Sequence, residues 1–154
     1  MSAAPRECVV DASVGVKLVV PEELSAQADS LFALLEQQPL AHFCVPDLFF
    51  IECANVLLKY VRRLKYPTYE AQQDIIQLTA LNLDQRPAVS LSADAFELAR
   101  QFELSAYDAC YVVLAKQLDC PLVTADERLV RKFVNTDYKV VWLGDLDLES
   151  SEQE

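Results

Sequence analysis

Short apolar runs alternate along the chain with longer segments in which apolar residues recur every three or four positions. The short runs are rich in β-branched and aromatic residues, which predicts strands at residues 7–11, 42–45, 87–91, 121–124 and 139–143. The longer segments predict helices around residues 28–35, in the segment that carries Glu52, and at residues 69–82, 93–103, 106–118 and 126–134. This alternation predicts an α/β domain whose parallel sheet is covered by helices on both faces.

The length of the chain, 154 residues, fits one domain with a sizeable core. We expect this domain to span residues 1–144. The segment DLDLESSEQE at residues 145–154 is an acidic tail that we expect to fray, and we assign it no function.

The strongly acidic composition limits how the protein can meet nucleic acid. A net charge of −11 and a pI near 4.5 argue against a general nucleic-acid coat, because binding to phosphates depends on lysine and arginine. Any nucleic acid must therefore meet a local basic patch.

Glycine and histidine are too scarce for several classes of enzyme. With only Gly15 and Gly144, the chain has neither a P-loop nor a dinucleotide-binding GxGxxG loop. The single histidine, His42, lies on a predicted strand, where we expect a structural role. The sequence therefore argues against a catalytic serine triad and against a histidine-rich metal site.

The five cysteines lie mostly in apolar segments, and no two have the CxxC spacing of a zinc or redox site. We expect them to be reduced core thiols of a cytoplasmic protein. No apolar run approaches the ~18 residues that span a bilayer, and no export signal precedes the domain, so we expect no membrane association.

Four acids follow the predicted strand ends. Asp11 ends the first predicted strand and Asp126 lies two residues after the fourth, while Glu52 lies early in the helix after the second strand and Asp108 opens a later helix. The carboxyl ends of parallel strands share one edge of the sheet, where ligands bind. We therefore expect the four acids to converge there.

Helix capping offers a structural alternative for two of these acids. The segments from Ser105 to Asp108 and from Thr124 to Glu127 both resemble capping boxes. Capping does not explain convergence, because four like charges on one edge resist ionisation unless a cation lies between them. Mg²⁺ or Mn²⁺ suits an oxygen-only site, and such sites usually act on phosphate esters.

The helix that carries Glu52 has two opposed stripes. We predict an apolar stripe composed of Phe50, Ala54, Leu57, Val61 and Leu64. The opposite stripe begins with an acid and an amide and continues with cations: Glu52, Asn55, Lys59, Arg62 and Arg63. The three cations either form an ordinary solvated face or guide RNA. A second basic segment, with Arg128, Arg131 and Lys132, is the competing path.

Four segments in this order resemble the successive motifs of PIN-domain ribonucleases, especially the VapC-type toxins of bacterial toxin–antitoxin pairs. The segments are VVDASVGVKLVVPEE, PDLFFIECANVL, LSAYDACYVVLAKQL and PLVTADERLV, and the resemblance covers about residues 7–143. It implies that a metal-binding quartet is formed by Asp11, Glu52, Asp108 and Asp126. It also implies that Ser13 and Thr124 orient ligands or water, and that Asn55 is a supporting polar residue.

The resemblance carries further expectations about fold and function. It implies a three-layer fold with five parallel strands in the order 3-2-1-4-5, Mg²⁺ or Mn²⁺ dependence, and RNA cleavage that leaves a 5′-phosphate and a 3′-hydroxyl. It also implies a homodimer and an antitoxin partner. The chain departs from many relatives at Gly15 and Leu18, where a bulkier pair is common, which bears on dimer or antitoxin geometry.

Two other functions stay open from the sequence. One is a phosphate-accepting signalling domain, although the predicted third strand, at AVSL, ends without the required acid. The other is a catalytically silent PIN-like binding module, against which the intact quartet argues.

Overall fold

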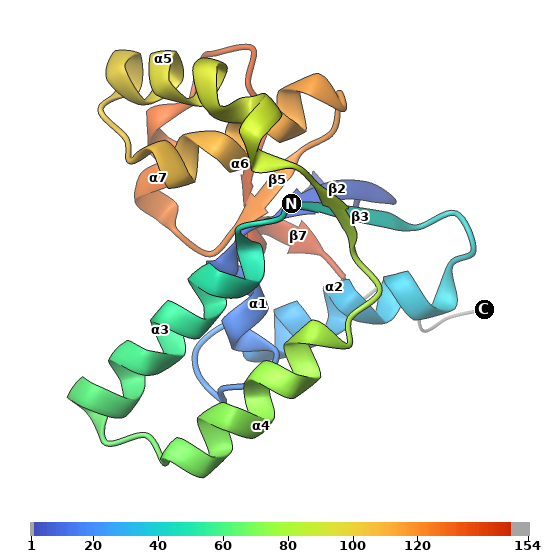
Figure 1. The fold of residues 1–154 in the computed structure, drawn as a ribbon. Coiled ribbons are helices and arrows are strands. Elements are labelled where there is room, and N and C mark those ends of the chain that lie inside the picture. Colours follow the sequence, from blue (N-terminus) through green and yellow to red (C-terminus); the bar gives the residue numbers. More distant parts are fainter. Residues whose placement is uncertain (1, 149–154) are drawn as a thin grey trace.

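A five-stranded parallel sheet forms the centre of the protein (Figure 1). The structure is a computed structural model, and it describes residues 2–148. The strands lie in the order β4-β3-β2-β5-β6, which numbered along the chain is 3-2-1-4-5 as predicted. Their bounds are β2 (Glu7–Val10), β3 (His42–Pro46), β4 (Asp84–Arg86), β5 (Leu122–Thr124) and β6 (Val140–Trp142).

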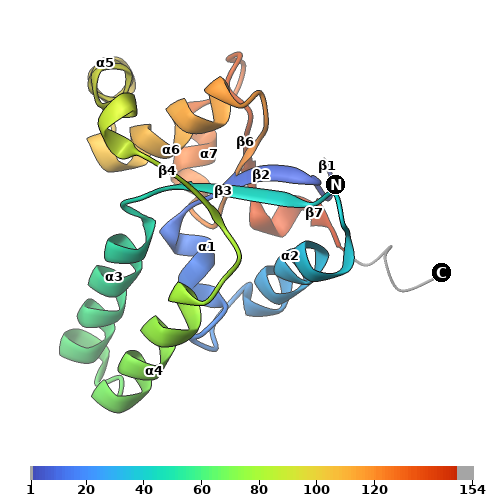
Figure 2. The same ribbon diagram turned by 45° about the vertical axis from the view of Figure 1, so that its right-hand side comes forward.

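Helices cover both faces of this sheet, which gives three layers. One face carries α5 (Ser92–Phe102), α6 (Ala106–Gln117) and α7 (Glu127–Lys132) (Figures 1 and 2). The other carries α1 (Ala12–Lys17), α2 (Ser25–Gln37), α3 (Phe49–Leu64) and α4 (Thr68–Thr79). The described chain also has two short 3₁₀ helices, η1 (Ala88–Leu91) and η2 (Leu143–Asp145).

The core forms because the central strands are buried from both sides. Val9 and Val10 in β2 and Leu122 and Val123 in β5 have no exposed surface, as expected for continuous apolar runs in a parallel sheet. On α6, the whole stretch 109–115 is buried, because this helix packs on β2 and β3. Among the described residues, no helix has the length and apolarity needed to span a membrane.

The third strand differs from its prediction. The strand predicted at 87–91 is in fact Asp84–Arg86, and Ala88–Leu91 is the 3₁₀ helix η1. Pro87 has no N–H for a sheet ladder, and the Ala88 N–H donates to Asp47 Oδ1 at 3.0 Å, so the chain turns after Arg86. The true strand is polar because it lies at the sheet edge, and an apolar pattern therefore does not mark it.

The two ends of the described chain meet in a small second sheet. β1 (Ser2–Ala3) pairs in parallel with β7 (Leu146–Asp147). Leu146 and Asp147, at the start of the predicted acidic tail, thus have backbone that pairs with β1. Residues 149–154 of the predicted tail lie outside the described residues.

The apolar stripe predicted for α3 is confirmed in part, because Leu57 is buried and Phe50 and Val61 are partly buried against the core. The fully buried residues are Phe49, Cys53 and Leu57, spaced by one turn, whereas Leu64 is 69% exposed. Leu64 is exposed because it lies at the far end of α3, and the far ends of α3 and α4 project beyond the sheet (Figure 1). All five cysteines are buried free thiols, as the sequence predicted.

Close packing of α1 on α3 fixes the distance between the segments that carry Asp11 and Glu52. A Cβ at Gly15 would lie 2.6 Å from Cζ of Phe49 and 3.2 Å from Sγ of Cys53. Because Phe49 is fully buried, its ring cannot move into solvent. The absence of a side chain at Gly15 therefore allows α1 to approach α3 closely.

We predict that Gly15→Ala lowers the free energy of unfolding. Overpacking a core costs about 1–3 kcal/mol, whereas alanine gains at most about 1 kcal/mol in helix propensity. Urea unfolding measures the difference. In a Phe49→Leu background, which shortens the opposing side chain, the cost of Gly15→Ala should shrink. Equal stability of Gly15→Ala and the parent protein would contradict this account of the packing.

A candidate carboxylate site at the carboxyl edge of the sheet

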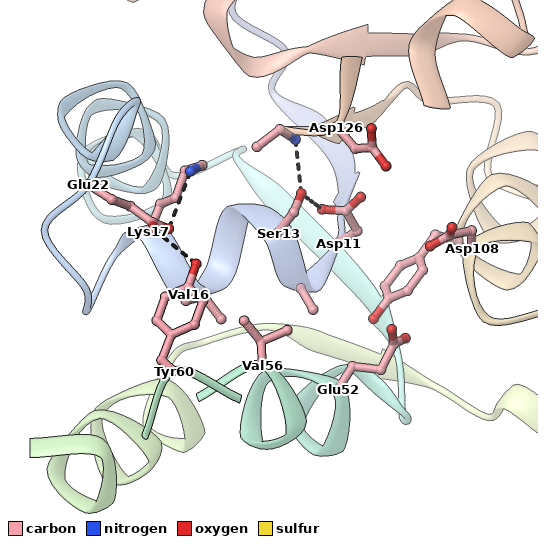
Figure 3. Close-up of a pocket in the computed structure, with 13 residues that line it drawn as sticks. Asp11, Ser13, Val16, Lys17, Glu22, Glu52, Val56, Tyr60, Asp108 and Asp126 are labelled. Carbon is pink, nitrogen blue, oxygen red and sulfur yellow. Dashed lines mark hydrogen bonds and ion pairs between the residues drawn. The ribbon is translucent and has the colours of Figure 1, made fainter. Parts of the chain in front are cut away.

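Four acidic side chains from four elements gather where the strands end. Asp11 follows β2 and Asp126 follows β5, while Glu52 and Asp108 lie in the first turns of α3 and α6. All four line one cavity of about 410 Å³, and their carboxylates point toward a common space (Figure 3). The structure thus brings together the four acids that the sequence singled out.

Asp11 is held by the backbone and by a hydroxyl. Its Oδ1 caps α1 by accepting from the Val14 N–H at 3.3 Å, and the Ser13 hydroxyl donates to the same oxygen (Figure 3). Ser13 Oγ also accepts from the Ala125 N–H at 2.9 Å and lies 3.4 Å from Thr124 Oγ1. Ser13 therefore ties the end of β2 to the end of β5.

Asp126 is fixed at the start of α7. Its Oδ1 accepts from the Arg128 N–H at 2.9 Å, and its own N–H donates to Thr124 Oγ1 at 3.1 Å. The capping box predicted from Thr124 to Glu127 is wrong, because the fully buried Thr124 side chain bonds to the turn and Asp126 is the N-cap. Thr124 supports Asp126 instead.

Asp108 and Glu52 begin their helices differently. Ser105 caps α6 as predicted, with its Oγ accepting from the Asp108 N–H at 3.1 Å. The backbone of Asp108 makes this bond, so its side chain is available to the cavity. Glu52 Oε1 is buried with no hydrogen-bond partner among the described residues. A buried carboxylate oxygen without a partner is costly unless a cation or a donor satisfies it.

Burial and mutual repulsion perturb these acids. Burial, opposed by the Ser13 hydrogen bond and reinforced by Asp108, raises the pKa of Asp11 to about 6. Burial, opposed by the Tyr111 hydroxyl and reinforced by the charges of Asp108 and Asp11, raises the pKa of Glu52 to about 7. Burial and the charge of Asp126 raise the pKa of Asp108. The site therefore disfavours four simultaneous negative charges when no cation is bound.

Sequence reasoning missed three residues that line one end of the cavity. Lys17 Nζ lies 3.3 Å from Glu22 Oε1, and the Tyr60 hydroxyl donates to Glu22 Oε2 at 2.9 Å (Figure 3). For Lys17 the sequence holds a signal, because Lys17 lies four residues after Ser13, a spacing that places both on one side of α1. The meaning of this spacing is not apparent from the sequence alone, because the pattern predicts no helix at residues 12–17.

Tyr111 was also missed. It lines the cavity, is 1% exposed, and its hydroxyl is buried beside Glu52 without a regular hydrogen bond in the described part of the chain. Tyr111 follows Asp108 by three residues on α6, a spacing that places both on one face of a helix. Its hydroxyl is a neutral donor poised next to the Glu52 carboxylate.

The remaining predicted residues lie outside the cavity wall. Asn55 is exposed on α3 and is not among the lining residues. The cations of α3 are exposed too, at positions Lys59, Arg62 and Arg63. Arg128 is nearest to the acids, with Nε 3.9 Å from Asp126 Oδ1. His42 lies at the start of β3, at the opposite edge of the sheet, and is not part of the carboxylate site.

The donor set of the cavity suits a hard divalent cation. Its acids offer only oxygen ligands, and Mg²⁺ and Mn²⁺ prefer such ligands. The buried Glu52 Oε1, which lacks a hydrogen-bond partner among the described residues, and the convergence of four carboxylates on one cavity both fit a bound cation. The residues present therefore fit a metal-binding role.

Comparisons with known proteins identify the family and the fold. The PIN domain family matches residues 8–133. Ribonuclease VapC3 of Pyrobaculum aerophilum is 37% identical over 127 residues, which cover 81% of this chain and 93% of that protein. Two solved structures share the fold. PAE2754 from Pyrobaculum aerophilum has a TM-score of 0.65 and 22% identity over 93% of each chain. A toxin–antitoxin complex from Klebsiella pneumoniae has a TM-score of 0.58 and 16% identity over 87% of this chain and 95% of that chain.

The region matched by the family contains all four acids, all but the first residue of β2, and the whole of β3, β4 and β5. Both structural likenesses are below 25% identity and concern the fold alone. The family match and the identity to VapC3 each cover most of the chain. The chain therefore belongs to the PIN domain family.

Proposed function

We propose that this protein is a metal-dependent endoribonuclease and the toxin of a toxin–antitoxin pair. The observation that carries the proposal is the convergence of four carboxylates from four elements on one cavity. Membership of the PIN domain family and a relative named as a ribonuclease support RNA as the substrate. The proposed products carry a 5′-phosphate and a 3′-hydroxyl.

In this proposal Asp11, Glu52, Asp108 and Asp126 hold Mg²⁺ or Mn²⁺. When bound, such a cation lowers the pKa of a water nucleophile and offsets charge on the phosphate in the transition state. The protein supplies the positions of the ligands: Ser13 holds Asp11, and Thr124 holds the backbone of Asp126. Residues fixed in this way lose little entropy when the substrate binds.

RNA must reach this site across an acidic protein. The proposed path follows α3, where Lys59 and Arg63 lie two and three turns after Glu52, on its side of the helix. Arg62 lies beside them, and Arg128 flanks the cavity next to Asp126. In the cavity itself, Glu22 offsets the charge of Lys17, so the exposed cations of α3 are the better candidates for phosphate contacts.

Partner proteins are part of the same proposal. Solved structures with this fold include toxin–antitoxin complexes, which supports a cognate antitoxin. Large apolar side chains are exposed along α3 and α4, at Ile51, Leu58, Leu64, Tyr69 and Ile76. Exposed apolar surface of this kind is typical of protein interfaces. We propose that such surfaces serve an antitoxin and the second subunit of a homodimer.

Of the two alternative functions, the signalling domain is disfavoured, whereas the silent binding module is tested by RNA cleavage. A phosphate-accepting signalling domain is disfavoured, because the chain belongs to the PIN domain family and its third strand ends at Arg86 without an acid. A silent binding module would keep the fold without catalysis. Absence of RNA cleavage by the parent protein with Mg²⁺ or Mn²⁺ would favour that module.

We expect Asp11→Asn to reduce RNA cleavage by at least ~100-fold, the scale of losing one preorganised catalytic group. The fold should persist, because the Asn oxygen can still accept from Val14 and Ser13. Cleavage of a mixed single-stranded RNA pool with Mg²⁺, together with a thermal melt, measures both effects. Asp94→Asn, at an exposed acid of α5, is the matched control and should cut at the parent rate. Parent-like cleavage by Asp11→Asn would remove Asp11 from the mechanism.

Removing divalent cations with EDTA should stop cleavage, and Mg²⁺ or Mn²⁺ should restore it. Zn²⁺ should restore little activity, because it favours nitrogen and sulfur ligands in a tetrahedral arrangement. The same RNA assay with each ion measures the effect. Full activity in excess EDTA would defeat the metal-dependent mechanism.

Thermal melts measure the binding of Mg²⁺ or Mn²⁺ to the carboxylate site without an activity assay. The raised pKa values of Asp11 and Glu52 favour the folded state at low pH, and this contribution is lost as pH rises through about 6 to 7. Mg²⁺ should therefore raise the melting temperature more at about pH 8 than at about pH 5, and less in Asp11→Asn. Equal Mg²⁺ effects in the parent and Asp11→Asn would place the ion elsewhere.

We predict that replacing Lys59, Arg62 and Arg63 together with Gln weakens RNA binding by several-fold to about a hundredfold at low salt. The salt dependence should flatten, because each lost phosphate contact releases about one fewer counterion. Fluorescence anisotropy with a labelled RNA on a metal-free sample gives both values. The matched variant replaces Arg128, Arg131 and Lys132. A reduced salt slope in that variant alone would move the RNA path to α7.

A further inference from the structure

A second group of possible metal ligands lies at the edge strand, away from the carboxylate site. His42 is the first residue of β3, Cys44 lies two residues later, and Asp84 begins β4. Residues two apart on a strand point to the same face, and Cys44 is in register with Asp84. The three side chains therefore meet on one face of the sheet. The four acids follow the opposite ends of the strands, so the two groups are separate.

The distances between these ligand atoms match a metal site. His42 Nε2 lies 3.1 Å from Asp84 Oδ2, and Cys44 Sγ lies 3.8 Å from Asp84 Oδ2 and 3.9 Å from His42 Nε2. Tetrahedral zinc with bonds of ~2.0–2.3 Å separates its ligand atoms by roughly 3.3–3.6 Å. Each observed separation is within a few tenths of an ångström of this range. Within residues 2–148, this is the one group of three or more His, Cys, Asp or Glu side chains whose ligand atoms lie within 4.8 Å of each other.

The chemistry of the group differs from that of the carboxylate site. It combines an imidazole, a thiol and a carboxylate, a set that favours zinc and similar transition metals over Mg²⁺. Cys44 is buried, whereas the His42 and Asp84 side chains are 49% and 33% exposed. A metal held by these three residues would have access to solvent, which could supply water as the fourth ligand.

One cation already occupies part of this site. Arg86 donates to Asp84 Oδ2 from Nε at 3.2 Å and from Nη2 at 2.9 Å. Its side chain is 44% exposed, so the guanidinium can move into solvent when another cation approaches. Arg86 should therefore compete with a metal, and its removal should strengthen metal binding.

We propose that His42, Cys44 and Asp84 bind one zinc-type transition-metal ion, which joins the edge strand β4 to β3. The role of this ion is structural, because its ligands lie at the start or in the middle of β3 and β4, whereas the four acids lie beyond the carboxyl ends of the strands. β4 has only three residues and leads directly into η1 and α5, so a bond between β4 and β3 would fix the start of that segment. Binding to the folded chain alone would also stabilise the protein.

Titration of the full chain with Co²⁺ tests this site, in the presence of a reductant that contains no thiol. We expect about one equivalent to give the ultraviolet absorption of a cobalt–thiolate bond, and Zn²⁺ to displace it. Cys44→Ala should abolish the band, and His42→Gln should weaken the affinity by at least about tenfold. His42→Gln changes a half-exposed side chain, so it should fold like the parent. Arg86→Gln should bind Co²⁺ more tightly than the parent.

Two control variants locate the ion. Cys120→Ala removes another buried thiol and should keep the cobalt–thiolate band, and Asp11→Asn should keep it as well. Mg²⁺ should not compete with Co²⁺ for this band. A parent protein without the band, or a His42→Gln variant that binds Co²⁺ as tightly as the parent, would overturn the proposal.

Discussion

Repulsion among four carboxylates at one edge of a parallel sheet is the constraint on which the site depends. Burial raises the pKa values of Asp11, Glu52 and Asp108, and the charges of neighbouring acids add to the effect. Such a cluster is unfavourable for the fold alone. It becomes favourable when a divalent cation shares the carboxylates, so the feature that costs stability is the one that creates affinity for metal.

Helix caps, a bridging hydroxyl and close helix packing hold the acids of this cluster in place. Asp11 and Asp126 are N-caps of α1 and α7, so two of the acids also stabilise local structure. Ser13 joins the ends of β2 and β5, and Gly15 lets α1 lie close to α3. Capping and metal binding are therefore compatible uses of the same carboxylates, because a carboxylate has several acceptor positions.

Local patterns in the sequence predicted the parallel sheet and the convergence of the acids, because buried strands and the residues after them leave strong signals. The strand order came instead from the resemblance to PIN-domain ribonucleases. It failed at the edge strand, where Asp84, Gln85 and Arg86 lack an apolar pattern and Val89 in η1 is 81% exposed. It also missed Tyr111 and the group formed by His42, Cys44 and Asp84. Spacing within one element links Tyr111 to Asp108 and His42 to Cys44, but the contacts of Tyr111 with Glu52 and of Cys44 with Asp84 join separate segments, which no spacing in the sequence marks.

The central claim is that the four carboxylates share a divalent cation, and anomalous diffraction from crystals soaked in Mn²⁺ tests it most directly. The account predicts a manganese peak within coordination distance of Asp11 and of at least one of Glu52, Asp108 and Asp126. It also predicts that the peak is lost in crystals of Asp11→Asn. Well-ordered side chains of all four acids with no peak between them would contradict the account.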